Sequence, residues 1–337
     1  MRHLLFLVLF VCSSCTEPNV KDMLGDDFRL YKHTPAWSLA KAVEDEDTTE
    51  ISKQVLQMHI SVDYRDPEYK QTLLMLATRT NKIESVKKLL ELGANPNAHN
   101  DSTKYFGQSA VLLACRFTRP SSKILALLLK YGGNPNSTAC GVQENGLGEI
   151  VPIRDFALSA AVFSSFEKVK LLVDAGANIN YATSTENCAI ENCMIFDRMD
   201  IMLYLLQKGA DYRRKFKEID LDKPDYPTFE VDILYKLRKC VYPIGSKEYT
   251  DKMKVVNFLK KKGLDYWKSP IPSGMYGVIM RDIAPKNKAD FDYYISIIKM
   301  VSLIIMILNQ ILCGSLNFTP ARFGLSKEGR YTWVPFF

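Results

Sequence analysis

The sequence predicts an all-α repeat protein, a solenoid of about five to six helix-turn-helix units joined by loops and capped by a C-terminal helical segment. Three observations support this prediction. A short apolar segment ending in a small residue recurs along the chain, a glycine follows each copy at a nearly constant distance, and an aliphatic pair stands just before that glycine. Such a unit is too small to bury its own apolar face, so neighbouring units have to stack.

The recurring segment predicts the first helix of each unit. It runs from Thr72 to Ala77 in the clearest copy and from Ser109 to Ala114 in the next. Ala160 and Cys193 hold the position of the final alanine in the two later copies. The sequence therefore contains four clear units.

The second helix of each unit is predicted to end at a glycine. The aliphatic pairs are Leu89-Leu90, Leu128-Leu129, Leu172-Val173 and Leu205-Leu206, and the glycines are Gly93, Gly132, Gly176, Gly209 and Gly263. Glycine adopts the left-handed C-cap conformation without steric cost. Because the helix pair is nearly constant while the glycine spacing is not, insertions are expected in surface loops.

Two degenerate units extend the array at both ends. One starts near Trp37, and a later one is centred on Val255–Leu259, ahead of Gly263. Before the later unit we expect a long loop over Asp211–Pro227 and a helix over Phe229–Cys240, whose apolar residues share one helical face. The predicted organisation is a solenoid over residues 37–266 and a capping region over residues 267–337.

These units resemble ankyrin repeats, whose period is about 33 residues and whose first helix opens Thr-Pro-Leu-His-x-Ala. Leu73 and Met75 replace the proline and histidine of that signature here. The glycine step, the aliphatic pair and the following Asn-x-Asn agree better, at Asn95–Asn97, Asn134–Asn136 and Asn178–Asn180. The resemblance implies β-finger loops between units and a protein-binding module without catalytic activity.

The N-terminus reads as a secretory signal over residues 1–14. A short positive start precedes the apolar stretch Leu4–Val11, which is too short to cross a bilayer. Small residues leading into Cys15 are similar to the cleavage box of bacterial lipoproteins, although Cys12 replaces the preferred leucine. Ordinary secretion with cleavage after Ser14, or a non-bacterial chain, is the alternative.

Lipidation of Cys15 is the interpretation we favour, because a multiply acylated residue anchors stably and residues 15–36 suit a tether. Thr16 follows the cysteine where an inner-membrane signal has aspartate. That resemblance implies an outer-membrane lipoprotein of the bacterial cell envelope, facing the periplasm.

The composition argues against several other classes. A net charge of +6 is spread over 337 residues without basic runs, so nucleic-acid binding is not expected. No phosphate loop, nucleophile elbow or zinc motif is present, and we expect no catalytic residues, no cofactor and no metal. Asp63, Asp66 and Glu68 lack the spacing of a cation loop.

The cysteines after Cys15 give no clear indication of a metal site or of a disulfide framework. Cys115 and Cys193 fall on first helices and are expected to be small buried hydrophobic residues. Cys140 and Cys188 lie in neighbouring connectors, so a disulfide between them is an open alternative.

Partner-binding residues are predicted from the positions that ankyrin units expose. The two residues that lie two and three places after the alanine face the groove: Arg79-Thr80, Arg116-Phe117, Val162-Phe163 and Ile195-Phe196. Tyr69, Tyr105 and Phe106 are expected on the finger loops. An exposed aromatic stripe favours a covering partner, and Tyr, Phe and Arg are typical of binding surfaces. The predicted binding set is Tyr69, Arg79, Tyr105, Phe106, Arg116, Phe117, Phe163 and Phe196.

Alternatives to partner binding stay open. The connector Ser137–Pro152 or the C-terminal segment could cover the groove, and a one-residue register error would turn Phe196 inward. The favoured function is a lipid-anchored interaction module, an immunity protein or an adaptor, monomeric apart from its partner. One other hypothesis is an enzyme with its catalytic part in residues 267–337. Another is a scaffold that spans a membrane at Tyr294–Leu312. Lys299 inside this segment and the absence of a flanking basic cluster favour a capping helix there instead.

Overall fold

The computed structural model describes residues 24–103, 106–144, 149–153, 155–183, 187–220, 227–243, 245–270, 272, 275, 323–325 and 331–333. Two compact units are present. The first comprises residues 1–240 and 247–270, and the second comprises residues 241–246 and 271–337. The second unit contains the antiparallel pair β5 (Phe323–Leu325) and β6 (Tyr331–Trp333). Residues Tyr294–Leu312 lie outside the described ranges, and none of the described helices is long and apolar enough to cross a membrane.

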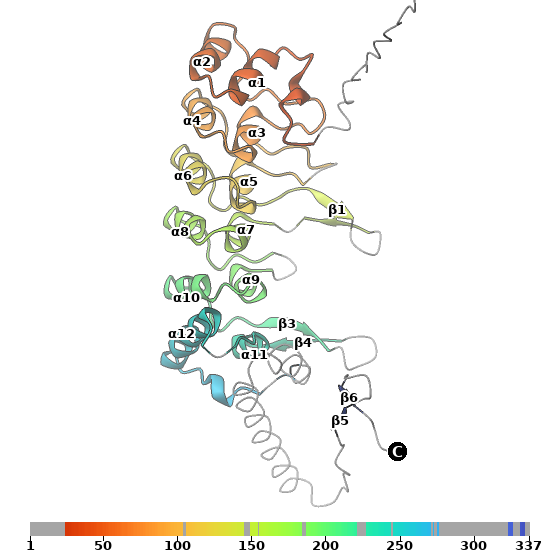
Figure 1. Cartoon of the computed structure of the whole chain (residues 1–337), viewed down its shortest axis with the longest axis vertical. Coiled ribbons are helices and arrows are strands. Elements are labelled where there is room, and N and C mark those ends of the chain that lie inside the picture. The colour runs from red at the N-terminus through yellow and green to blue at the C-terminus, as the bar shows by residue number, and fades with distance from the viewer. Residues whose placement is uncertain are drawn as a thin grey trace, which may run out of the picture. The chain divides into compact units, whose positions relative to one another are not determined.

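Helix pairs make up the first unit, as predicted. They are α1 (Trp37–Glu44) with α2 (Thr48–Leu56), α3 (Leu73–Arg79) with α4 (Ile83–Glu91), α5 (Ala110–Arg116) with α6 (Ser122–Lys130), α7 (Ala157–Ser164) with α8 (Phe166–Asp174), and α9 (Ala189–Ile195) with α10 (Met199–Gln207). Two further helices follow, α11 (Ile233–Lys239) and α12 (Lys247–Lys261), and α12 packs against α10. Single turns of 3₁₀ helix, η2 (Phe28–Tyr31) and η3 (Tyr266–Lys268), precede and follow all these helices. From α1 to α10, odd-numbered helices form one layer and even-numbered helices the other (Figure 1).

Local sequence sets where these helices begin and end. The side chains of Thr72 and Ser109 accept hydrogen bonds from the backbone N–H groups of Met75 (3.3 Å) and Leu112 (3.2 Å), which are N-cap interactions. All five predicted capping glycines have positive φ, between 86° and 101°. The predicted helix ends are therefore confirmed.

Leucines from successive units form a continuous core between the layers. Leu73, Leu89, Leu112, Leu128 and Leu205 are fully buried. Each such side chain contributes about 1.5–3 kcal/mol when it is removed from water, so stacking stabilises units that cannot fold alone.

The Asn-x-Asn motif links consecutive units. Asn97 Oδ1 accepts from the backbone N–H of Asn134 (2.7 Å), and Asn136 Oδ1 accepts from that of Asn178 (2.7 Å). Asn180 Oδ1 continues the pattern by accepting from Asp211 N (2.8 Å). The second asparagine of each motif therefore satisfies the first loop N–H of the next unit, which explains why the motif recurs.

Two connectors extend into antiparallel hairpins. β1 (Val142–Glu144) pairs with β2 (Ile150–Pro152), and β3 (Phe216–Ile219) pairs with β4 (Thr228–Val231). Both hairpins project on the side of the odd-numbered helices (Figure 1).

The second hairpin corrects two predictions. The expected loop over Asp211–Pro227 contains a strand, and the helix expected from Phe229 starts only at Ile233. Asp232 caps that helix by accepting from Tyr235 N (2.9 Å). The aromatic and β-branched residues before this cap suit a strand once β3 lies beside them.

Gly133 stands where the neighbouring units have Ala94, Ala177 and Ala210. We expect Gly133→Ala to lower the free energy of unfolding by about 1–3 kcal/mol, because overpacking a filled site forces the backbone to shift. A Cβ at this position would lie 2.7 Å from both Leu128 O and Val111 Cγ2. Urea denaturation checks this, and unchanged stability would contradict it.

The cysteines show no disulfide chemistry in the described part of the chain. Cys115 and Cys193 are fully buried, and burial raises the pKa of the Cys115 thiol to about 12. Both are therefore unreactive hydrophobic residues, as predicted. Cys140 and Cys188 are free thiols, so the disulfide considered from the sequence is absent between them.

Candidate functional site

The odd-numbered helices end at a face that also receives the finger loops. Four apolar side chains at these helix ends are exposed: Phe117 by 39%, Phe163 by 56%, Ile195 by 63% and Phe196 by 42%. We call these four residues the aromatic column. The rings of Phe163 and Phe196 meet edge to face with centroids 5.1 Å apart. The column therefore continues from one unit to the next, and Phe196 faces outward.

Val162 was predicted to share this face and does not. Its side chain is fully buried, while Phe163 is exposed. Val162 points into the stack, where α7 packs against α5 and α9, whereas Phe163, one position and about 100° further round the helix, faces solvent. The backbone oxygen of Val162 accepts from Arg198 Nη1 (2.9 Å), which holds this turn against the next unit.

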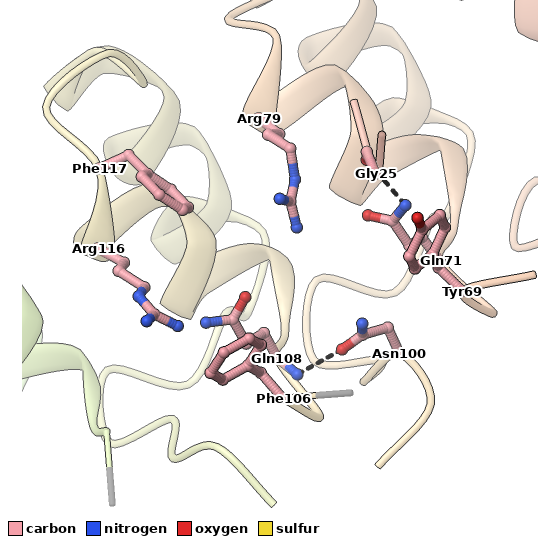
Figure 2. A pocket seen from close by; sticks show the side chains of 9 residues that line it. All are labelled: Gly25, Tyr69, Gln71, Arg79, Asn100, Phe106, Gln108, Arg116 and Phe117. Carbon is pink, nitrogen blue, oxygen red and sulfur yellow. Dashed lines mark hydrogen bonds between the residues drawn. The ribbon is translucent and has the colours of Figure 1, made fainter. Parts of the chain in front are cut away.

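Five of the predicted binding residues line a single pocket. It measures about 240 Å³ and lies between the ends of α3 and α5 and the finger loops. The predicted residues in its lining are Tyr69, Arg79, Phe106, Arg116 and Phe117. Gly25, Gln71, Asn100 and Gln108 complete it, and Figure 2 shows the Arg79 guanidinium near the middle of the group.

Gln71 and Gln108 were not predicted as site residues, although the sequence contains a signal that could have indicated them. Gln71 and Gln108 occupy equivalent positions, each directly before the N-cap residue of a first helix. Their side chains are almost fully buried, at 1% and 3% exposure. A buried polar residue repeated at one position of successive units is a site candidate, but its burial is visible only in the structure.

Aromatic rings hold the two arginines. The Arg116 guanidinium carbon lies 4.7 Å from the centroid of Phe106 and 6.0 Å from that of Phe117. Arg79 lies 5.8 Å from the Phe117 ring. Guanidinium groups stacked on ring faces keep their N–H edges available for a planar acceptor.

The charges around the two arginines are only partly balanced. Arg116 forms an ion pair with Asp155 at 3.4 Å, in which both side chains are about one third exposed. Burial lowers the pKa of Arg79 from its ordinary value, opposed by the attraction of Asp26. Within the described residues, no carboxylate oxygen lies within 4 Å of the Arg79 side chain. The pocket is therefore cationic.

Asp66 builds the loop that carries Tyr69 and Gln71. Its buried carboxylate accepts from the backbone N–H groups of Glu68 (2.9 Å), Tyr69 (2.6 Å) and Gln71 (2.7 Å). Burial raises the pKa of this carboxyl above its ordinary value, and the three hydrogen bonds oppose the shift. The carboxylate is thus occupied by backbone donors, and no cluster of metal-binding side chains occurs among the described residues.

Some predicted features lie outside the described residues. They are Tyr105, Cys15 and most of the C-terminal segment considered as a cover for the groove. The connector Ser137–Pro152 was the other candidate cover. Its Ala139 packs with Ile153 against Leu112, and Phe117 and Phe163 remain exposed. The described part of the connector therefore leaves the aromatic column open.

Comparison with known proteins identifies the repeats. Residues 39–139 match the family model of ankyrin repeats in three copies. The putative ankyrin repeat protein L86 of Acanthamoeba polyphaga mimivirus is 29% identical over 149 residues, which cover 39% of this chain and only 24% of that protein. The chain is also similar to the crystal structure of EF0377, an ankyrin repeat protein, with 20% sequence identity and a TM-score of 0.44. This match covers 66% of this chain and 96% of the EF0377 chain. Residues 39–139 therefore contain ankyrin repeats, and this matched part of the chain includes Tyr69, Arg79, Phe106, Arg116 and Phe117 of the pocket.

Proposed function

We propose that this chain binds a partner protein across the aromatic column and the adjoining pocket. Ankyrin repeats are protein–protein interaction modules, generally without catalytic activity. The single observation that supports this face is the row of exposed apolar side chains on three successive units. Water disfavours such a row, and Phe and Arg are residue types that contribute binding energy at interfaces.

Site-specific photo-crosslinking tests the location. A benzophenone amino acid replaces Phe163 or Phe196 in the full chain, and irradiation takes place in the native cell envelope. Tyr131 is the control position, because it is an exposed aromatic residue at the end of the outer helix α6. We expect a protein adduct from Phe163 and Phe196 and none from Tyr131. Adducts only from Tyr131 would place the binding surface elsewhere.

The proposal includes anchoring of the chain by lipid on Cys15 in a bacterial outer membrane. The apolar stretch and the cysteine that follows it support this. Cells labelled with a palmitate analogue should yield labelled wild-type chain and unlabelled Cys15→Ala variant. Label on the variant, or no label on either chain, would overturn this part of the proposal.

The finer role we propose is inhibition of a toxin delivered into the periplasm, with an adaptor for an envelope enzyme as the alternative. A tethered binder without catalytic activity suits an immunity protein. Identification of the crosslinked partner decides between them, since a toxin supports the first role and a resident envelope enzyme the second.

A further inference from the structure

The pocket contains three buried polar atoms without a hydrogen-bond partner. They are Gln71 Oε1, Gln108 Nε2 and Arg79 Nε. A buried polar atom left unpaired costs about 1–3 kcal/mol. Three such atoms in one pocket are therefore unfavourable for folding and point to a ligand that supplies their partners.

The chemical types of these atoms define that ligand. Arg79 Nε and Gln108 Nε2 are donors, and the Arg116 guanidinium, which lies on the Gln108 side of the group in Figure 2, adds further donors. Several donors with two positive charges suit a carboxylate, which accepts from guanidinium groups in a planar arrangement.

Gln71 adds a requirement for a donor. Its Nε2 already donates to Gly25 O at 2.9 Å, so the unpaired atom is the oxygen, an acceptor. The ligand must carry an N–H group close to its carboxylate. A polypeptide provides both at an acidic residue, whose main-chain N–H lies a few bonds from its carboxylate.

The acidic residues near the two arginines pair with them only weakly, so the arginines can bind the carboxylate of a ligand. The Arg116–Asp155 pair is long and partly exposed, and pairs of this kind contribute little. Asp26 is exposed and attracts Arg79 without an ion pair within 4 Å. The Gln108 amide reaches a ligand by rotation about its terminal torsion, which is soft, while Gln71 keeps its hydrogen bond to Gly25.

We propose that this pocket binds an aspartate or glutamate side chain of an extended partner segment. The carboxylate lies between Arg79 and Arg116 and accepts from Gln108 Nε2, while Gln71 Oε1 accepts from a main-chain N–H of the same segment. This proposal rests on the proposed function, because the partner supplies the segment. It adds an electrostatic specificity that the aromatic column lacks.

Capped single residues test the pocket without the partner. N-acetylglutamate N-methylamide, the matching glutamine compound, acetate and inorganic phosphate are each titrated into the full chain. The readout is the NMR signals of arginine Nε–Hε groups, assigned with Arg79→Met and Arg116→Met. We expect saturable shifts from capped glutamate with a dissociation constant on the order of millimolar, and at least about tenfold weaker binding of capped glutamine.

Variants separate the roles of the side chains. Arg79→Met should abolish the response, whereas Arg119→Ala, which removes an exposed arginine outside the pocket, should retain it. Gln71→Met should weaken the binding of capped glutamate about threefold or more. The binding of acetate should not change, since acetate has no N–H group. Thermal melting verifies folding, and Arg79→Met should melt close to the wild-type temperature, because loss of the long contact with Phe117 (5.8 Å) is offset by removal of the unpaired Nε.

Two outcomes would overturn this proposal. Equal binding of phosphate and capped glutamate would make the pocket a general anion site, and no response would mean that it is not a site. Crosslinking at Phe163 with no NMR response to capped glutamate would refute the proposed carboxylate pocket and leave the partner-binding face supported. Capped-glutamate binding without crosslinking at Phe163 or Phe196 would refute the partner-binding face alone.

Discussion

The double substitution Phe163→Ser with Phe196→Ser is expected to weaken partner binding about a hundredfold or more, because central aromatic residues at an interface each contribute about 2 kcal/mol. The two rings contact each other and are 56% and 42% exposed in the free chain. Their removal should lower the free energy of unfolding by only about 1 kcal/mol per residue. Binding is measured by titration of the crosslinked partner, and stability by urea denaturation.

A matched aromatic pair on the opposite layer provides the control. Phe166 and Tyr204, on the outer helices α8 and α10, also meet edge to face, with centroids 5.4 Å apart. Both side chains are half-buried, so Phe166→Ser with Tyr204→Ser should cost at least as much stability and leave binding unchanged. If Phe163→Ser instead lost several kcal/mol of stability, the ring would belong to the core.

Replacing Asp66 with alanine is expected to destabilise the chain by about 3 kcal/mol or more, because three backbone N–H groups lose their acceptor and each unpaired group costs about 1 kcal/mol or more. The carboxylate is fully buried, so water replaces it poorly. The loop that it closes carries Tyr69 and Gln71, and the variant should also lose the response to capped glutamate. Urea denaturation measures the first effect, and NMR titration the second.

Asp63→Ala is the control for this experiment. Asp63 accepts from a single backbone group, Asn95 N, at 3.0 Å and is partly exposed. It should cost about 0.5–1.5 kcal/mol, the net value of one hydrogen bond. Equal losses from the two substitutions would show that the Asp66 hydrogen bonds contribute less than their geometry indicates.

The stack of helix pairs was predictable because its determinants are local. An apolar face repeated at helical spacing, an aliphatic pair and a glycine at φ near 90° encode each helix and its end without reference to the rest of the chain. The resemblance to ankyrin units implied that Phe117, Phe163 and Phe196 are exposed, and all three side chains are exposed. Their role in partner binding remains a prediction.

Local sequence therefore specifies the units and their caps, and the resemblance to ankyrin repeats indicates the exposed column, whereas contacts between distant residues create the pocket and the exceptions. Val162 is buried because α7 packs against α9, and Phe229 joins a strand because β3 lies beside it. Gly133 has no room for a methyl group because Leu128 and Val111 approach it. Gln71 and Gln108 lose access to water only when two units and the N-terminal segment come together. Burial and orphaned hydrogen-bonding atoms depend on contacts between residues far apart in the chain, which local periodicity does not specify.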